Sequence, residues 1–135
     1  MSDATRDLLT RYYQAFNNQD MEGFLNLLTD DVIHDINQGG REVGKQAFAG
    51  FMQRMNRSYR EQIVDLTIMT DPSGQRAAAE FTVLGTYLAT DEGLPEAKGQ
   101  TYRLPAGAFF EIRDGKVARV TNFYNLQDWL TQVQG

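Results

Sequence analysis

The period of the hydrophobic pattern changes along this chain of 135 residues, and the change restricts the folds that are open to it. Over most of the first 56 residues, apolar side chains recur every three or four positions, which is typical of amphipathic helices. From Tyr59 onwards they tend to alternate with polar ones, which is typical of strands with one buried face. Helices followed by a run of antiparallel strands indicate an α+β fold with the helices on one side of the sheet.

Cap and turn residues set the expected limits of these elements. Asp20 is placed to cap a second helix, after a first one whose apolar face runs from Leu8 to Phe16. The second helix is expected to carry Leu28, and a third follows over residues 45–56. Strands are expected over residues 30–37, 59–70, 76–89, 100–112 and 116–125, reverse turns over 38–40, 71–74 and 113–115, and a short closing helix over 126–133.

The first predicted strand carries the only histidine of the chain, His34. Successive side chains of a strand point to opposite faces, so Val32, His34 and Ile36 share one face. The other face holds Ile33, Asp35 and Asn37. His34 is therefore a candidate for the interior side of the sheet.

Composition excludes several classes of function. A net charge of −5, with acidic and basic residues interspersed, gives no basic surface for nucleic acid. No apolar run approaches the ~18 residues that a membrane span needs, and no secretory signal precedes the first helix. The chain has no cysteine and one histidine, and its glycines form no phosphate-binding loop, so no metal and no cofactor are expected. We expect one domain over residues 1–135, in the cytoplasm.

The order of elements resembles the ketosteroid isomerase and SnoaL-like branch of the nuclear transport factor 2-like superfamily. The resemblance extends over essentially the whole chain and rests on the order and spacing of several short anchors. These are Arg11-Tyr12, Asp20, Thr29-Asp30-Asp31, the glycine-rich turn before the third helix, and the last strand from Gly115-Lys116-Val117 to Tyr124.

The resemblance implies a cone-shaped α+β barrel of the cystatin-like type. Three helices from the N-terminal half pack on a strongly curved, mostly antiparallel sheet and enclose a deep apolar pocket. It also implies a homodimer formed through the outer face of the sheet.

Ketosteroid isomerases use a tyrosine, a basic aspartate and a protonated acid to stabilise an enolate. Carried over by position, the tyrosine corresponds to Tyr12, which is present. The aspartate position falls near Ile36 and the protonated-acid position near Ala108, and neither side chain can replace the original group. The resemblance therefore does not imply a steroid isomerase.

In this family arrangement, strand parity assigns further residues to the pocket. Besides Tyr12 and His34, the expected face is mostly apolar with a few polar groups, which suits a small hydrophobic molecule. The expected substrate contacts are Tyr124, Tyr87, Tyr102, Ile36, Phe81, Val83 and Phe110, with Asn122 beside them.

Two functional hypotheses remain open. In the first, His34 moves a proton while Tyr12 and Asn122 donate hydrogen bonds to the carbonyl or enolate of an isomerase, cyclase or hydratase substrate. In the second, the chain is a non-catalytic module that binds a hydrophobic ligand or forms a dimer, and His34 is simply a buried histidine with a polar neighbour. Asp35 is either functional, as a base brought round by a bulge or as the residue that orients His34, or a solvated or helix-contacting residue on the other face. Residues 90–99 form either a lid or an exposed hairpin loop.

Overall fold

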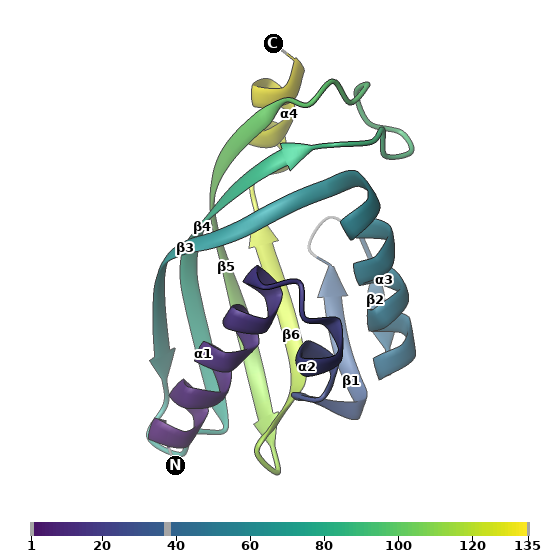
Figure 1. The fold of residues 1–135 in the computed structure, drawn as a ribbon. Helices are drawn as coiled ribbons and strands as arrows, with labels where there is room; N and C mark the ends of the chain where they lie inside the picture. Colours follow the sequence, from purple (N-terminus) through teal and green to yellow (C-terminus); the bar gives the residue numbers. More distant parts are fainter. Residues whose placement is uncertain (1, 37–38, 135) are drawn as a thin grey trace.

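A curved six-stranded sheet forms the body of the protein (Figure 1). The computed structural model describes residues 2–36 and 39–134. The strands follow the order β2-β1-β6-β5-β4-β3, and every neighbouring pair is antiparallel except β1 with β6. Their limits are β1 (Leu28–Ile36), β2 (Arg41–Val43), β3 (Tyr59–Thr70), β4 (Arg76–Tyr87), β5 (Thr101–Arg113) and β6 (Lys116–Tyr124).

Three helices, α1 (Ser2–Asn17), α2 (Met21–Leu25) and α3 (Lys45–Ser58), lie on the inner side of the curved sheet (Figure 1). A fourth helix, α4 (Leu126–Gln134), lies at one end of the sheet against β5. The α+β class and the three helices of the N-terminal half confirm the fold expected from the sequence. No helix in the described part of the chain is long and apolar enough to cross a membrane.

Local sequence explains most of the element limits. Asp20 caps α2 by accepting a hydrogen bond from the backbone N–H of Gly23 at 3.0 Å. Asp71 holds the β3–β4 turn, where its carboxylate accepts from the N–H groups of Gly74 and Arg76. The long strands β3 to β6 agree with the sequence expectation to within two residues at each end.

The sequence expectation differs from the structure in the first half of the chain. The second helix ends at Leu25, and Leu28 opens β1 instead of closing that helix. Strand β2 was not predicted, because three residues are too few to show a period of two. Asn37 and Gln38, expected to end the first strand and begin its turn, lie outside the described residues.

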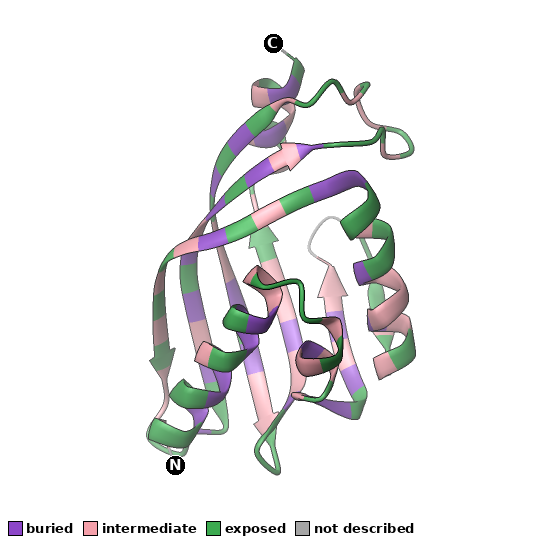
Figure 2. Ribbon diagram, in the orientation of Figure 1, coloured by how far each residue is buried: buried purple, intermediate pink, exposed green. Residues whose placement is uncertain are grey.

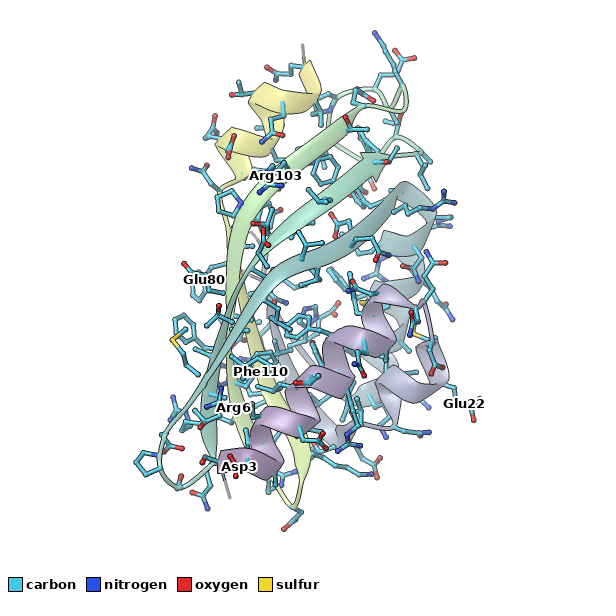
Figure 3. The ribbon with its side chains drawn as sticks, turned by 60° about the vertical axis from the view of Figure 1, so that its left-hand side comes forward. Asp3, Arg6, Glu22, Glu80, Arg103 and Phe110 are labelled. Carbon is cyan, nitrogen blue, oxygen red and sulfur yellow. The ribbon has the colours of Figure 1, made fainter. Side chains whose placement is uncertain are left out.

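The core lies between α1 and the inner face of the sheet. Buried and more exposed residues alternate along the long strands (Figure 2), and the alternation is strict along β4. Phe110 of β5 is fully buried and meets the Tyr12 ring edge-on at 5.5 Å, whereas Glu80 projects from the opposite face of the sheet (Figure 3). Alternation along the strands therefore decides which side chains face α1.

One close approach inside the sheet requires a glycine. Gly85 of β4 pairs directly with Tyr102 of β5, and the Tyr102 ring crosses the position that a side chain at residue 85 would occupy. A Cβ atom there would lie 2.1 Å from Cζ of Tyr102, well inside contact distance. Glycine destabilises a strand interior, but only glycine leaves room here for the Tyr102 ring.

We expect Gly85→Ala to destabilise the protein by about 2 kcal/mol or more, since overpacking of this kind costs ~1–3 kcal/mol. Gly50→Ala is the matched control. Gly50 lies inside α3 with its nearest neighbour at an ordinary 3.6 Å, so alanine should stabilise the helix by ~0.5–1 kcal/mol. Urea unfolding of both variants measures the difference, and equal stabilities would contradict the packing argument.

Candidate active site

A cavity of about 350 Å³ opens between the inner face of the sheet, α1, α3 and the segment after β4. That volume lies within the range of small-molecule sites. Most of the lining is apolar or aromatic, and the polar side chains are few. The polar and titratable lining residues are Tyr12, Tyr13, Gln19, His34, Asn56, Tyr59, Glu61, Asp91, Asn122 and Tyr124.

His34 reaches the cavity from β1 and is only 2% exposed. Its ring stacks on Phe48 of α3, with centroids 4.2 Å apart and an interplanar angle of 4°, and meets Phe51 edge-on at 4.6 Å. Two aromatic rings therefore fix the plane of the imidazole. Only its two nitrogens remain to make polar contacts.

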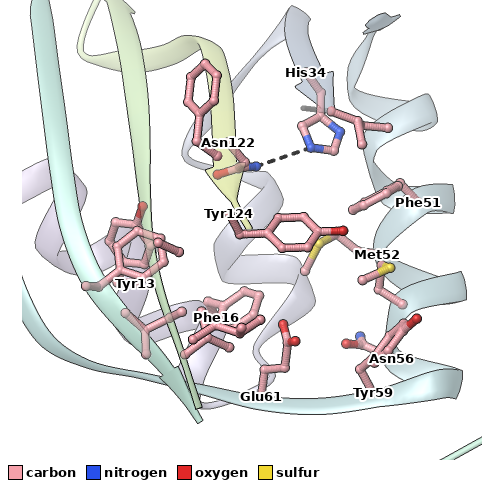
Figure 4. Close-up of a pocket in the computed structure, with 18 of the residues that line it drawn as sticks. Tyr13, Phe16, His34, Phe51, Met52, Asn56, Tyr59, Glu61, Asn122 and Tyr124 are labelled. Atoms are coloured by element: carbon pink, nitrogen blue, oxygen red, sulfur yellow. Dashed lines mark hydrogen bonds between the residues drawn. The ribbon is translucent and has the colours of Figure 1, made fainter. Parts of the chain in front are cut away.

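Each nitrogen of His34 faces a different polar group. Nδ1 lies 3.6 Å from Oε1 of Glu42, on the neighbouring strand β2, and Nε2 lies 3.5 Å from Nδ2 of Asn122, on β6 (Figure 4). A carboxylate beside Nδ1 favours the tautomer that carries its proton there. Nε2 then keeps its lone pair on the side of Asn122 and the cavity.

Burial lowers the pKa of His34 below its usual value. The negative charge of Glu42, and to a smaller extent that of Asp35, opposes the shift. His34 is therefore neutral at pH 7. The Nε2 lone pair faces the Asn122 amide and the cavity, and a neutral imidazole with its lone pair on that side is a proton acceptor. If His34 takes up a proton, the imidazolium lies beside the Glu42 carboxylate.

Asp35 does not orient His34, which corrects one of the two sequence interpretations. Its carboxylate lies on the other face of the sheet, where it accepts from Arg41 at 2.6 Å and from the hydroxyl of Thr121 at 2.9 Å. The Arg41 guanidinium holds the pKa of Asp35 below its usual range. Glu42 is the carboxylate beside His34, and the sequence reasoning missed it because β2 was not recognised.

Tyr12 lies on α1 and lines the cavity. Its ring packs against Tyr13, Phe24 and Phe110 at centroid distances of 5.0, 4.6 and 5.5 Å. Burial raises the pKa of its hydroxyl well above the usual value. The hydroxyl therefore stays protonated and can donate a hydrogen bond.

The other predicted contacts divide into two groups. Ile36, Phe81, Val83 and Tyr124 line the cavity, in agreement with strand parity. Tyr87, Tyr102 and Phe110 face the interior but are buried outside the cavity lining, so the structure does not bring these three to the cavity. Parity gives the face of a side chain, but helix α1 and neighbouring rings fill part of that face.

Tyr59 and Tyr87 attach residues 90–99 to the rest of the molecule. The hydroxyl of Tyr59 donates to Asp91 at 2.8 Å, and that of Tyr87 donates to the carbonyl of Pro95 at 2.6 Å and accepts from the N–H of Asp91. Asp91 and Leu94 of this segment line the cavity. The segment therefore forms part of the cavity wall.

Several lining residues were missed or interpreted differently at the sequence level. Glu61 lies on the inner face of β3, where its position between the buried Tyr59 and Ile63 was a signal that an acid points inwards. The apolar face of α3, interpreted as core, contributes Phe51 and Met52 to the cavity. Within residues 2–36 and 39–134, no three His, Cys, Asp or Glu side chains gather to hold a metal ion.

The curved sheet and its cavity agree with the fold expected from the sequence, and sequence comparison specifies the family. Residues 9–120 match the SnoaL-like domain, so the chain belongs to the SnoaL-like family. A comparison with curated proteins returns no match.

Solved structures of candidate polyketide cyclases are similar to this chain along nearly its whole length. Those from Pseudomonas putida KT2440 and Xanthomonas campestris pv. campestris share 63% and 54% identity, with TM-scores of 0.94 and 0.95; each alignment covers 98% of both chains. An epoxide hydrolase-like protein from Mycobacterium tuberculosis shares 16% identity at a TM-score of 0.75, over 98% of this chain and 91% of that one, which shows a common fold.

We expect Glu42→Gln to lower the pKa of His34 further, because it removes the nearest negative charge. Asp35→Asn is the matched control, since that carboxylate is turned away and its effect on His34 is smaller. An NMR titration of the single histidine measures both changes. A larger shift for Asp35→Asn would contradict the assignment of Glu42.

Proposed function

We propose that this protein is an acid/base enzyme that needs no cofactor and acts on a small hydrophobic carbonyl compound. The observation that carries the proposal is the pairing of His34 with Glu42 and Asn122 at the wall of an apolar cavity. The same side chains could satisfy a merely structural histidine. The cavity beside them has room for a substrate within reach of the proton acceptor.

The chemistry would begin with proton removal next to a carbonyl group. Nε2 of His34 takes the proton of the C–H bond, the electron pair of that bond forms the enolate, and Glu42 stabilises the imidazolium. The enolate oxygen accepts hydrogen bonds from Tyr12 or from the amide of Asn122, and Tyr124 orients the substrate. Where a double bond is conjugated with the enolate, return of the proton to its far carbon gives isomerisation. Attack of the enolate on a second carbonyl forms a carbon–carbon bond and an alkoxide, and the alkoxide takes the proton back from His34, which gives cyclisation.

The comparisons favour the cyclase form of this chemistry. The relatives at 52–63% identity are candidate polyketide cyclases, and an aldol-type ring closure begins with the same enolate. The positions that hold the acids of steroid isomerases are occupied by Ile36 and Ala108. His34, with Glu42 behind it, would replace the missing base.

Proton abstraction can be tested before the substrate is known, with 1-decalone in deuterium oxide. The wild type should exchange the C–H protons beside the carbonyl for deuterium, measured by mass spectrometry. His34→Gln keeps the shape of the side chain but removes the base, so we expect exchange to fall at least ~100-fold. If both proteins bind decalone but neither exchanges its protons faster than buffer, the result would refute the enzyme hypothesis and favour a ligand-binding module.

The exchange rate should also depend on pH in one direction. His34 accepts a proton only when neutral, and burial places its pKa below the usual 6.5. The rate should be constant above that pKa and fall about tenfold per pH unit below it. A rate that rises towards acid pH would exclude His34 as the base.

We also propose that the protein forms a homodimer through the outer face of the sheet. Phe109 of β5 is 52% exposed and Phe123 of β6 is 43% exposed, and their rings meet at 5.6 Å. Leu84 of β4 is exposed on the same face. A second copy would remove this apolar surface from water.

Replacement of either ring by a charge should break such a dimer. We expect Phe109→Glu and Phe123→Glu to be monomers in native mass spectrometry and sedimentation equilibrium. Leu88→Glu is the control, because Leu88 is 43% exposed beyond the end of β4, away from the aromatic pair. A monomeric wild type would contradict the dimer.

A further inference from the structure

Glu61 is an acid at a position where the sheet otherwise places apolar side chains. It lies on the inner face of β3 between Tyr59 and Ile63, which are both buried, and it lines the cavity. Figure 4 shows its carboxyl group across the cavity from His34, with Tyr124 between them. The proposed chemistry of His34 does not use this group.

Three neighbouring strands build the surroundings of Glu61. Glu61 pairs with Gly85 of β4, and Gly85 pairs with Tyr102 of β5, so the three residues lie in one row across the sheet. The absence of a side chain at Gly85 lets the Tyr102 ring cross β4, and its hydroxyl donates to Oε2 of Glu61 at 2.5 Å. The glycine therefore serves the contact between the tyrosine and the acid.

The environment of Glu61 disfavours a negative charge. None of the ion pairs within the described residues involves it, and Oε1 has no hydrogen-bond partner there. The titratable groups around it are Tyr59 on its own strand, Tyr102 on β5, Tyr124 on β6 and Asp91 of the segment after β4, and none is a cation. Burial raises the pKa of Glu61, and the Tyr102 hydroxyl opposes part of that rise.

We propose that Glu61, in its neutral form, donates a hydrogen bond from its cavity-facing oxygen to a second oxygen of the substrate. Tyr102 occupies Oε2, which leaves Oε1 to carry the proton towards the cavity. The substrate class is then a compound with two oxygen functions on an apolar skeleton, one at His34 and one at Glu61. This inference rests on the proposed function, because His34 must hold the reacting carbonyl.

Two probes of matched shape test the assignment. trans-Decalin-1,5-dione has two carbonyl groups and 1-decalone has one, and calorimetry measures the binding of each. At pH 6 the wild type should prefer the dione about threefold to tenfold, the worth of one hydrogen bond. Glu61→Gln should keep the preference, because its amide also accepts from Tyr102 and donates an N–H to the ligand.

Glu61→Leu should lose or reverse that preference, because it leaves the second carbonyl without a donor. Circular dichroism establishes that each variant is folded. A wild type without preference for the dione overturns the proposal, whether it binds both probes equally or neither. Loss of the preference in Glu61→Gln also overturns it, since a neutral hydrogen-bond donor at this position would then not account for the preference.

The pH dependence separates a binding role from a structural one. The dione preference of the wild type should fall towards one over about one to two pH units above the pKa of Glu61, and that of Glu61→Gln should not change. Tyr102→Phe removes the hydrogen bond that opposes the rise in that pKa, so its decline should begin at a higher pH. Equal profiles for all three proteins would contradict the assignment.

Failure of this inference can be told apart from failure of the proposed function. If deuterium exchange into decalone depends on His34 but the wild type does not prefer the dione, only the proposed role of Glu61 is refuted. A dione preference that depends on Glu61, without exchange, refutes the enzyme and with it the substrate assignment.

Discussion

The parallel pairing of β1 with β6 is the constraint on which the rest of the site depends. It joins the first strand of the chain to the last and places Ile36 beside Asn122 and His34 beside Val120. Parallel neighbours need a long crossover, and here almost the whole chain between them supplies it. Strands β3, β4 and β5 therefore continue the sheet from β6 and complete its curve (Figure 1).

The inner face of this sheet combines a packed half with a hollow half. Between α1 and β5, aromatic rings fill the space, and Tyr12 and Phe110 meet edge-on. Near α3 and the segment after β4, the cavity remains, and the polar groups Glu61, His34 and Asn122 face it. Isolated polar side chains in an apolar wall are costly, so their convergence on one cavity favours function over packing.

The change of hydrophobic period and the order of elements predicted the overall fold, and strand parity predicted part of the site. A period of two identified the inner positions of the long strands, which placed His34, Ile36 and Asn122 correctly. Parity could not tell a cavity wall from packed interior, since that depends on which rings α1 brings to each strand. Tyr102 shows the limit, because its ring faces inwards yet crosses Gly85 of β4 and ends against Glu61 of β3, two strands away.

The segment after β4 is held largely through its backbone. The Tyr87 hydroxyl binds the carbonyl of Pro95 and the N–H of Asp91, and neither bond depends on the side chain at those positions. Leu94, which faces the cavity between them, can therefore change while the segment stays docked. Related proteins can diverge in the compounds they accept through substitutions in this segment, while the sheet and its histidine remain unchanged.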